Sequence, residues 1–295
     1  MKKLSYIAIA LIITSTLSAS PWTLSVDANL TLTQNAYSNN WAGGEAGLLA
    51  WALNSNSLAE KQLSPKLNNK NTLKLAFGQI YNQDQDTKEW LDPVKSTDLI
   101  DFESVLRFTL GGFVDPFASA RLETQFLDVS DTSKNRIFNP INLTEAIGVA
   151  KVLVKAEKRE LTSRLGFGLK QIINREVLVD THYFREGRRV TQTTNYGGIT
   201  FVTDFNTPLA QEKITYTGKL SIFEAVFYSE ADELKGLPNE NYWQYPDVNW
   251  ENIFTASITK YLMVNLYLQL LYDKEIDDAV RLKETMGLGL TFKLI

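Results

Sequence analysis

The feature that most constrains the fold is an alternation of apolar and polar residues at period two, which recurs in segment after segment. In residues 98–111 the apolar positions include Phe102 and Phe108, and the polar positions include Asp101, Glu103 and Arg107. Successive side chains of a β-strand point to opposite faces of its sheet, so this pattern predicts strands with one apolar and one polar face. Residues 285–294 alternate in the same way.

About twelve such segments are predicted, many of roughly ten to sixteen residues, whereas an ordinary strand has about five or six. At about 3.3 Å per residue and a tilt of about 45°, roughly ten residues cross the hydrocarbon core of a membrane. The predicted ranges are 22–34, 43–58, 70–82, 98–111, 116–128, 142–157, 161–174, 197–206, 212–229, 250–259, 262–273 and 281–295. We therefore expect an all-β fold, a transmembrane antiparallel up-and-down β-barrel of about twelve strands.

The connections between these segments alternate in length. Short turns are predicted at 112–115, 158–160, 207–211 and 260–261, and long polar loops at 83–97, 129–141, 175–196 and 230–249. Outer-membrane barrels combine short periplasmic turns with long external loops in this way. Residues 59–69 are an exception, because they should form a short turn; either a strand extends into them or this turn is long.

The N-terminus has the order of regions that is typical of a secretory signal peptide. Lys2 and Lys3 precede the apolar run 6–13, and small and polar residues follow to Ser20. The apolar run is too short to cross a membrane as a helix. We expect residues 1–20 to be cleaved, after Ala19 or Ser20, and residues 21–295 to form an outer-membrane barrel.

Composition excludes several classes of function. Basic residues are not in excess, since the formal net charge is −4, and this argues against nucleic acid as a partner. The chain has no cysteine, so it has no disulfide and no thiolate metal site. Its one histidine, His182, makes histidine-based catalysis improbable. We expect no cofactor, no metal and no catalytic residue.

Charged residues on the predicted strands are candidates for the lumen, because a charge that faces lipid at the bilayer centre costs roughly 2–4 kcal/mol. A barrel of about twelve strands lies between the filled interior of eight strands and the open channel of sixteen. The sequence therefore leaves open whether these charges pair and close the lumen or line a narrow path. The candidates are Glu103, Arg107, Arg121, Glu123, Lys151, Lys155, Lys170, Lys219 and Glu224.

The predicted external loops carry further charge. Arg185, Arg188 and Arg189 are candidates for contact with lipopolysaccharide phosphates, which guanidinium groups bind well. The acidic loop segments match no calcium-binding loop. The expected partners are outer-membrane lipid, lipopolysaccharide and the barrel-assembly machinery.

Several short segments resemble a bacterial family of unknown function, domain-of-unknown-function family 3078. The clearest is Asp115–Phe126, which resembles the family's "DP-aromatic … ETQF" segment. Residues 41–44, 143–148 and 245–252 also resemble the family, and residues 258–273 are similar to proteins described as salt-induced outer-membrane proteins. The resemblance implies an outer-membrane β-barrel and no particular activity.

Three functional hypotheses follow. The first is an integral outer-membrane barrel, either structural or a narrow passive channel for small solutes, and not an enzyme. The second is a membrane-embedded, lipid-acting hydrolase that uses His182 as its base, although no Gly-x-Ser-x-Gly motif is present. The third is a soluble periplasmic β-sandwich that binds a ligand, since a sandwich also alternates.

Overall fold

The computed structural model describes residues 22–38, 45–179, 188–259 and 262–293, with side chains described as far as residue 289. The predicted signal peptide, residues 1–20, lies outside the described residues. His182 and Arg185 also lie outside them.

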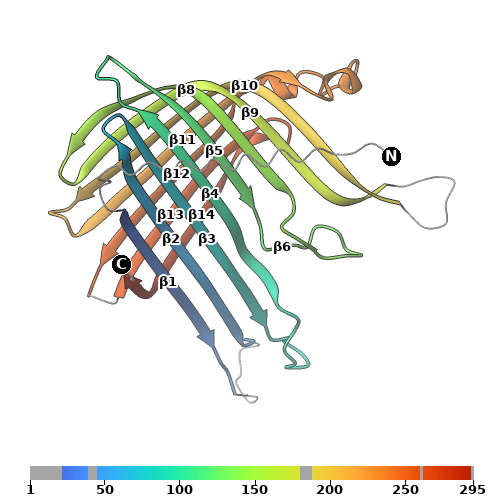
Figure 1. Ribbon diagram of the computed structural model, residues 1–295. Coiled ribbons are helices and arrows are strands. Elements are labelled where there is room, and N and C mark those ends of the chain that lie inside the picture. The colour runs from blue at the N-terminus through green and yellow to red at the C-terminus, as the bar shows by residue number, and fades with distance from the viewer. Residues whose placement is uncertain (1–21, 39–44, 180–187, 260–261, 294–295) are drawn as a thin grey trace.

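Across the described ranges, twelve long strands form one closed barrel (Figure 1). Neighbouring strands pair antiparallel, and β1 pairs with β14 to close the sheet. The bounds are β1 (Thr23–Asn35), β2 (Leu48–Ser64), β3 (Leu67–Asn82), β4 (Val94–Phe108), β5 (Asp115–Thr124), β8 (Ile141–Ala156), β9 (Arg159–Val179), β10 (Arg188–Leu209), β11 (Ile214–Tyr228), β12 (Asp247–Ser257), β13 (Leu262–Asp273) and β14 (Asp277–Lys293). The predicted fold class and strand number are confirmed, and a single closed sheet excludes the β-sandwich.

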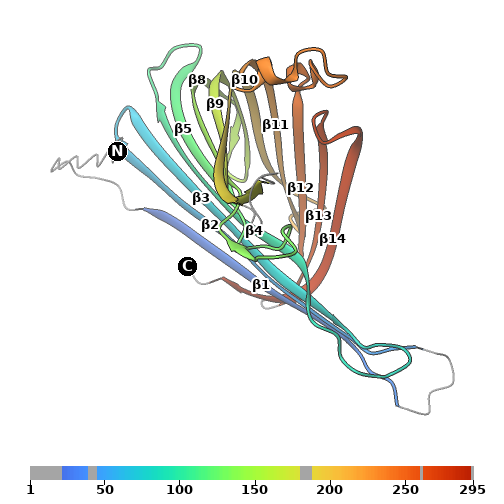
Figure 2. The ribbon, with the colours of Figure 1, turned by 90° about the vertical axis from the view of Figure 1, so that its right-hand side faces the viewer.

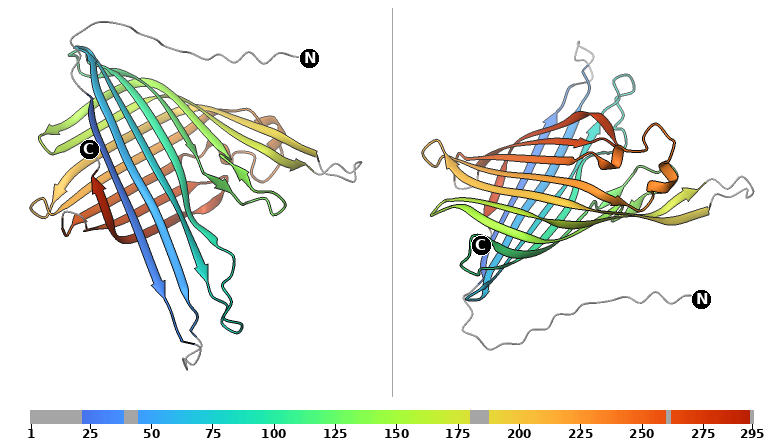
Figure 3. Two further views of the ribbon diagram at one scale, coloured as in Figure 1. Left: turned by 60° about the horizontal axis from the view of Figure 1, so that its bottom comes forward. Right: turned by 90° about the horizontal axis from the view of Figure 1, so that it is seen from above.

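Two predicted connections are shorter than expected because strands extend into them. β2 continues to Ser64 and β3 begins at Leu67, so residues 59–69 are mostly paired strand with a tight turn. The predicted loop 175–196 is partly wrong for the same reason, since Arg188 of β10 pairs with Val179 of β9. The resulting β9–β10 hairpin projects beyond the rest of the barrel (Figure 3).

The two ends of the barrel differ as predicted. The short turns lie at the end where β1 begins, and the longer connections lie at the opposite end (Figure 1). The connection between β13 and β14, residues 274–276, is an exception, because it is short and lies at the end of the long connections. One of these long connections contains the hairpin of β6 (Leu127–Asp128) and β7 (Arg136–Ile137), and another contains the 3-10 helices η1 (Ala231–Leu234) and η2 (Tyr242–Gln244). None of the helices within the described ranges is long and apolar enough to cross a membrane.

The alternation seen in the sequence becomes the inside and the outside of the barrel. On β4, Phe102 is 41% exposed on the outer surface, whereas its neighbours Asp101 and Glu103 are 4% and 8% exposed inside. Leu32 of β1 and Met286 of β14 also lie on the outer surface, which is therefore apolar. An apolar exterior around a polar interior is the arrangement of a membrane-spanning barrel and the reverse of a soluble one.

A small apolar cluster occupies one part of the inner wall. Phe117 of β5 is 5% exposed and packs with Ala146 and Ala150 of β8. Beside it the backbones of β8 and β9 approach closely at Gly148 and Gly166, where an added Cβ would lie 2.2 Å from a carbonyl oxygen of the facing strand. Glycine is required at both positions, and the small residues leave space inside the barrel for longer charged side chains.

Candidate functional site: a bridge of ion pairs across the lumen

The first half of the site is centred on Glu103 of β4. Its carboxylate accepts hydrogen bonds from Arg164 Nη1 of β9 at 2.8 Å and from Lys219 Nζ of β11 at 2.6 Å. Arg164 also donates to Asp204 of β10 at 3.0 Å. One buried carboxylate therefore ties together three strands, and each charge in this group has an opposite charge within hydrogen-bond distance.

The second half connects β3, β4, β5 and β12. Lys74 Nζ donates to Glu251 Oε2 at 2.6 Å, and the Arg121 guanidinium donates two hydrogen bonds to Asp101, at 2.7 and 3.0 Å. Lys74 also lies 3.9 Å from Asp101, which joins these two pairs into one group. A two-point contact between arginine and a carboxylate is strong and fixes the orientation of both groups.

Both halves cross the lumen instead of running along one wall. Four strands separate β4 from β11 in the barrel order, and at least four separate β3 from β12. In Figure 2, β3 and β4 lie on one wall and β11 and β12 on the wall that faces it. We call this group the ion bridge. It consists of Lys74, Asp101, Glu103, Arg121, Arg164, Lys219 and Glu251.

A polar cavity lies next to the ion bridge on the side of the short turns. Its volume is about 660 Å³. Thr72 and Thr217 line it together with Lys74, Glu103 and Lys219 of the bridge itself. We call this cavity the vestibule, and the ion bridge forms its inner end.

On the opposite side of the bridge, aromatic residues and a further ion pair occupy the lumen. Lys170 of β9 donates to Asp247 of β12 at 2.8 Å, and its Nζ lies 5.3 Å from the centre of the Tyr196 ring. Tyr196 stacks on Tyr228 at 4.6 Å, and Tyr228 lies 5.8 Å from Trp243 of η2. The long connection that contains η2 is thus anchored to the inner wall.

The structure places six of the nine predicted lumen charges inside the barrel. Glu103, Arg121 and Lys219 belong to the ion bridge, and Lys170 forms the pair with Asp247. The other two are Glu123, which lies 2.8 Å from Arg121, and Arg107, which lines the vestibule.

Of the remaining three predicted charges, Lys151 and Glu224 lie on the outer surface, and their assignment to the lumen is corrected. Ala150 faces inward, so the next residue, Lys151, faces outward. Its Nζ lies 3.1 Å from the centre of the ring of Phe113, an exposed residue in a short turn. Lys155 is exposed near the end of β8, in register with Glu160, which lines the vestibule, so it lies at the short-turn rim on the inner face. The ring of Phe223 lies near Lys170 inside the barrel. Glu224, the next residue on the strand, therefore faces outward, and it is exposed.

Four members of the ion bridge are not among the predicted lumen charges: Lys74, Asp101, Arg164 and Glu251. Asp101 could have been found, since it lies two residues before Glu103 and shares its face. The contacts of Lys74 and Glu251 join positions far apart in the chain. Nothing in the local pattern of either strand indicates this contact.

In the external region, the guanidinium of Arg189 contacts other parts of the protein. It donates to Asp131 Oδ2 at 2.8 Å, to Ser133 Oγ at 2.7 Å and to the carbonyl oxygen of Glu176 at 2.7 Å. Arg188 is exposed at the start of β10. The hydrogen bond from Arg189 holds the pKa of Asp131 below its usual range, and the hydrogen bonds from Ser133 act in the same direction. Arg189 therefore connects the loop between β6 and β7 to the end of β9.

Comparisons with known proteins find one family model and several solved structures. The model of the family described as "Protein of unknown function (DUF3078)" matches residues 32–129, which include the whole Asp115–Phe126 segment. The resemblance is thereby confirmed over less than half of the chain, and residues 143–148 and 245–252 lie outside the match. No curated protein matches the chain.

Three solved structures illustrate the likeness in fold. An outer membrane channel from Pseudomonas putida F1 is 12% identical, covers 95% of this chain and 98% of its own, and has a TM-score of 0.40. The β domain of the Bordetella autotransporter BrkA is 10% identical over 93% and 98%, with a TM-score of 0.37. The translocator domain of NalP from Neisseria meningitidis is 9% identical over 92% and 87%, with a TM-score of 0.34. Likenesses this weak do not bear on function.

Proposed function

We propose that this chain is an integral outer-membrane β-barrel whose lumen is closed to passive solute flow by the ion bridge. The observation that carries the proposal is the direct contact between facing walls, Lys74 to Glu251 and Lys219 to Glu103, both at 2.6 Å.

The energetics of the ion bridge support a closed state. Removing one partner from a buried ion pair typically costs about 3–5 kcal/mol, because the other charge stays buried without compensation. If opening the lumen exchanges one charge-assisted hydrogen bond of the bridge for water, a net cost of about 1.5–3 kcal/mol corresponds to an open fraction between about one in ten and one in two hundred. The intact barrel then conducts solutes rarely, and the narrow-channel hypothesis describes the state in which the bridge is broken.

Liposome swelling tests the proposal. The full chain is reconstituted into lipid vesicles and compared with the double variant Lys74→Ala/Lys219→Ala, with a small sugar as the solute. The matched control is Lys158→Ala, which removes a lysine from the exposed rim pair with Glu212. We expect slow swelling for the wild type and the control, and faster swelling for the double variant.

Two outcomes would contradict the proposal. One is a wild-type protein that admits the sugar as fast as an open porin, and the other is a double variant that swells no faster although it is folded. Folding is checked separately by heat-dependent migration on a gel, which reports an intact barrel. The proposal also includes lipopolysaccharide and the barrel-assembly machinery as partners, and no enzymatic activity; a lipase activity lost in His182→Ala would overturn the last point.

A further inference from the structure

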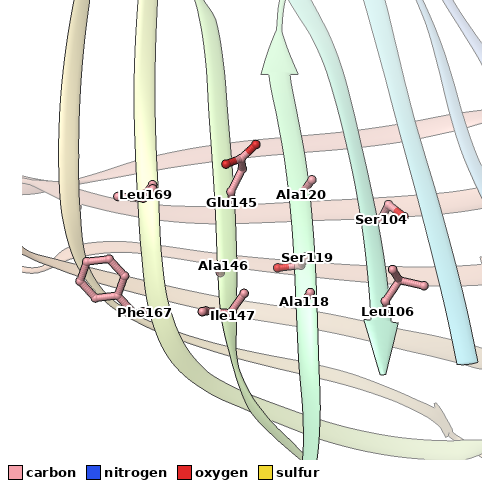
Figure 4. Close-up of a pocket in the computed structure, with 10 residues that line it drawn as sticks. All are labelled: Ser104, Leu106, Ala118, Ser119, Ala120, Glu145, Ala146, Ile147, Phe167 and Leu169. Carbon is pink, nitrogen blue, oxygen red and sulfur yellow. The ribbon is translucent and has the colours of Figure 1, made fainter. Parts of the chain in front are cut away.

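A shallow groove lies on the outer surface of the wall formed by β4, β5, β8 and β9 (Figure 4). Its volume is about 380 Å³. The small side chains of Ser104, Ala118 and Ala120 form its floor, and the larger side chains of Ile147, Phe167 and Leu169 form one side. The groove exists because two neighbouring strands carry small residues where the surrounding outer surface carries large ones.

This groove faces away from the lumen. Ile147 is 67% exposed, Phe167 47% and Leu169 49%, whereas Ala146, which precedes Ile147 on β8, is buried on the inner side. The groove is therefore open to whatever surrounds the barrel. In a membrane-spanning barrel the surroundings at this position are lipid.

One carboxylate lies in the groove. Glu145 of β8 pairs in register with Ala120 of β5 and Leu169 of β9, and its side chain is exposed. Figure 4 shows it between these two residues. Within the described residues, no hydrogen bond or ion pair joins its carboxylate to another side chain.

Apolar residues flank Glu145 on both sides along the same strand face. Ile141 and Leu143 precede it, and Ile147 and Val149 follow it at alternate positions of β8. Glu145 therefore has apolar neighbours on both sides along β8, and the exposed polar pair Gln171–Asn195 lies one step further toward the long-connection end, beside Leu143. A carboxylate at such a position is unfavourable unless a hydrogen-bond donor or an opposite charge reaches it.

We infer that this groove binds the acyl chain of an amphiphile whose amine donates a hydrogen bond to Glu145. The apolar side of the groove complements a hydrocarbon chain, and the carboxylate complements a cation in a medium where the charge interaction is weakly screened. The volume lies within the range of about 300–1,000 Å³ that small-molecule sites occupy. A protein partner would need about 800 Å² on each side, which is far more surface than this groove offers.

The inference rests on the membrane placement in the proposed function and is independent of the ion bridge.

The full chain is reconstituted in phosphatidylcholine vesicles, and binding of two nitroxide-labelled probes of equal chain length is measured by electron paramagnetic resonance. The probes are octadecylamine and stearic acid. We expect the amine to be preferred over the acid, and Glu145→Gln to reduce binding of the amine about tenfold, since one charge-assisted hydrogen bond is lost.

Two further variants separate the groove from a general effect on the lipid around the barrel. Ala120→Leu fills the floor of the groove and should reduce binding of both probes. Ser57→Leu is the matched control, because Ser57 faces outward on β2 in register with Leu73, which pairs with Phe102. It should leave binding of both probes unchanged.

The inference is overturned if the wild type binds the two probes equally, or if Glu145→Gln binds the amine as the wild type does. It is also overturned if the Glu145 variant changes only the oligomeric state, which would indicate a second copy of the chain in the groove. Liposome swelling of Glu145→Gln should equal that of the wild type. A failure of this inference is thus distinguishable from a failure of the proposed closed lumen.

Discussion

Glu103 and Glu145 are the same residue type on opposite surfaces of one barrel wall, and their environments differ completely. Glu103 is 8% exposed inside the lumen and accepts hydrogen bonds from two cations. Glu145 is exposed on the outer surface, among apolar side chains and without a partner among the described residues. The comparison teaches that strand parity, more than residue type, decides whether a charge holds this fold together.

The largest expected effect comes from replacing each glutamate by leucine. Glu103→Leu leaves Lys219 without a carboxylate partner and deprives Arg164 of one, so it should lower the free energy of unfolding by about 3–5 kcal/mol. Glu145→Leu removes a charge from the apolar surface and should leave the protein as stable as the wild type or more stable. Urea unfolding in lipid vesicles, followed by tryptophan fluorescence, measures both; equal losses of stability would break the comparison.

A second test adds a charge to each face. Phe102→Lys places an ammonium on the outer surface and should cost about 2–4 kcal/mol, because a cation there faces lipid. Thr217→Lys places the same group in the vestibule, where water solvates it, and should cost little. The yield of heat-modifiable barrel after folding into vesicles measures the difference. If Phe102→Lys folds as efficiently as Thr217→Lys, the assignment of outer and inner faces is wrong.

A third test moves to the external loops, where an ion pair is outside the membrane. The pKa of Asp131 is lowered in the folded state, chiefly by the hydrogen bond from Arg189. The stabilisation that it provides is therefore present above the usual pKa of aspartate, about 4, and is lost as the pH falls below that value. Protection factors of the β6–β7 hairpin in hydrogen exchange should be constant from pH 7 to about pH 5 and fall below about pH 4.

Asp131→Asn is the control for this pH dependence. The amide cannot ionise, so the variant should be less protected than the wild type at pH 7 and should lose less protection below about pH 4. A smaller fall remains, because Asp128 of β6, whose pKa is also lowered and which pairs with Arg136, still ionises. A wild-type hairpin whose protection does not change at acidic pH would show that Asp131 does not hold it.

The smallest effect is expected at the rim. Lys158 and Glu212 form an ion pair in which the side chains are 53% and 59% exposed. Exposed pairs typically contribute less than about 1 kcal/mol, so Lys158→Ala should change the urea midpoint by little more than the experimental error. A loss as large as that of Glu103→Leu would show that burial in the lumen is not what makes the ion bridge important.

The alternation of the sequence was sufficient to predict the architecture. Phe102 and Phe108 mark the apolar face of the predicted strand 98–111, and both side chains are on the outer surface. The structure of residues 59–69 is harder to predict, because the polar residues there resemble a loop although they pair as the ends of β2 and β3. Polar residues are compatible with a strand in which one face meets the polar lumen, so polarity alone does not indicate a loop here.

The candidate site could be predicted only in part. Glu103, Arg121 and Lys219 were found because a charge on a barrel strand has to avoid lipid. For Glu224 and Lys151 the prediction is wrong, because the cost of a charge in lipid does not determine which face of a strand it occupies, and alternation places both side chains on the outer side. The pairing of Lys74 with Glu251 depends on the diameter and register of the closed barrel, and these are properties of all twelve strands together.

Conductance in a planar bilayer is the measurement that tests the closed lumen most directly. The wild-type chain, folded and inserted, should show only rare and brief openings at neutral pH. Lys74→Ala/Lys219→Ala should show frequent openings, counted for each inserted barrel so that a lower folding yield does not affect the comparison. A steady open channel in the wild type, unchanged in the double variant, would contradict the conclusion that the ion bridge closes the barrel.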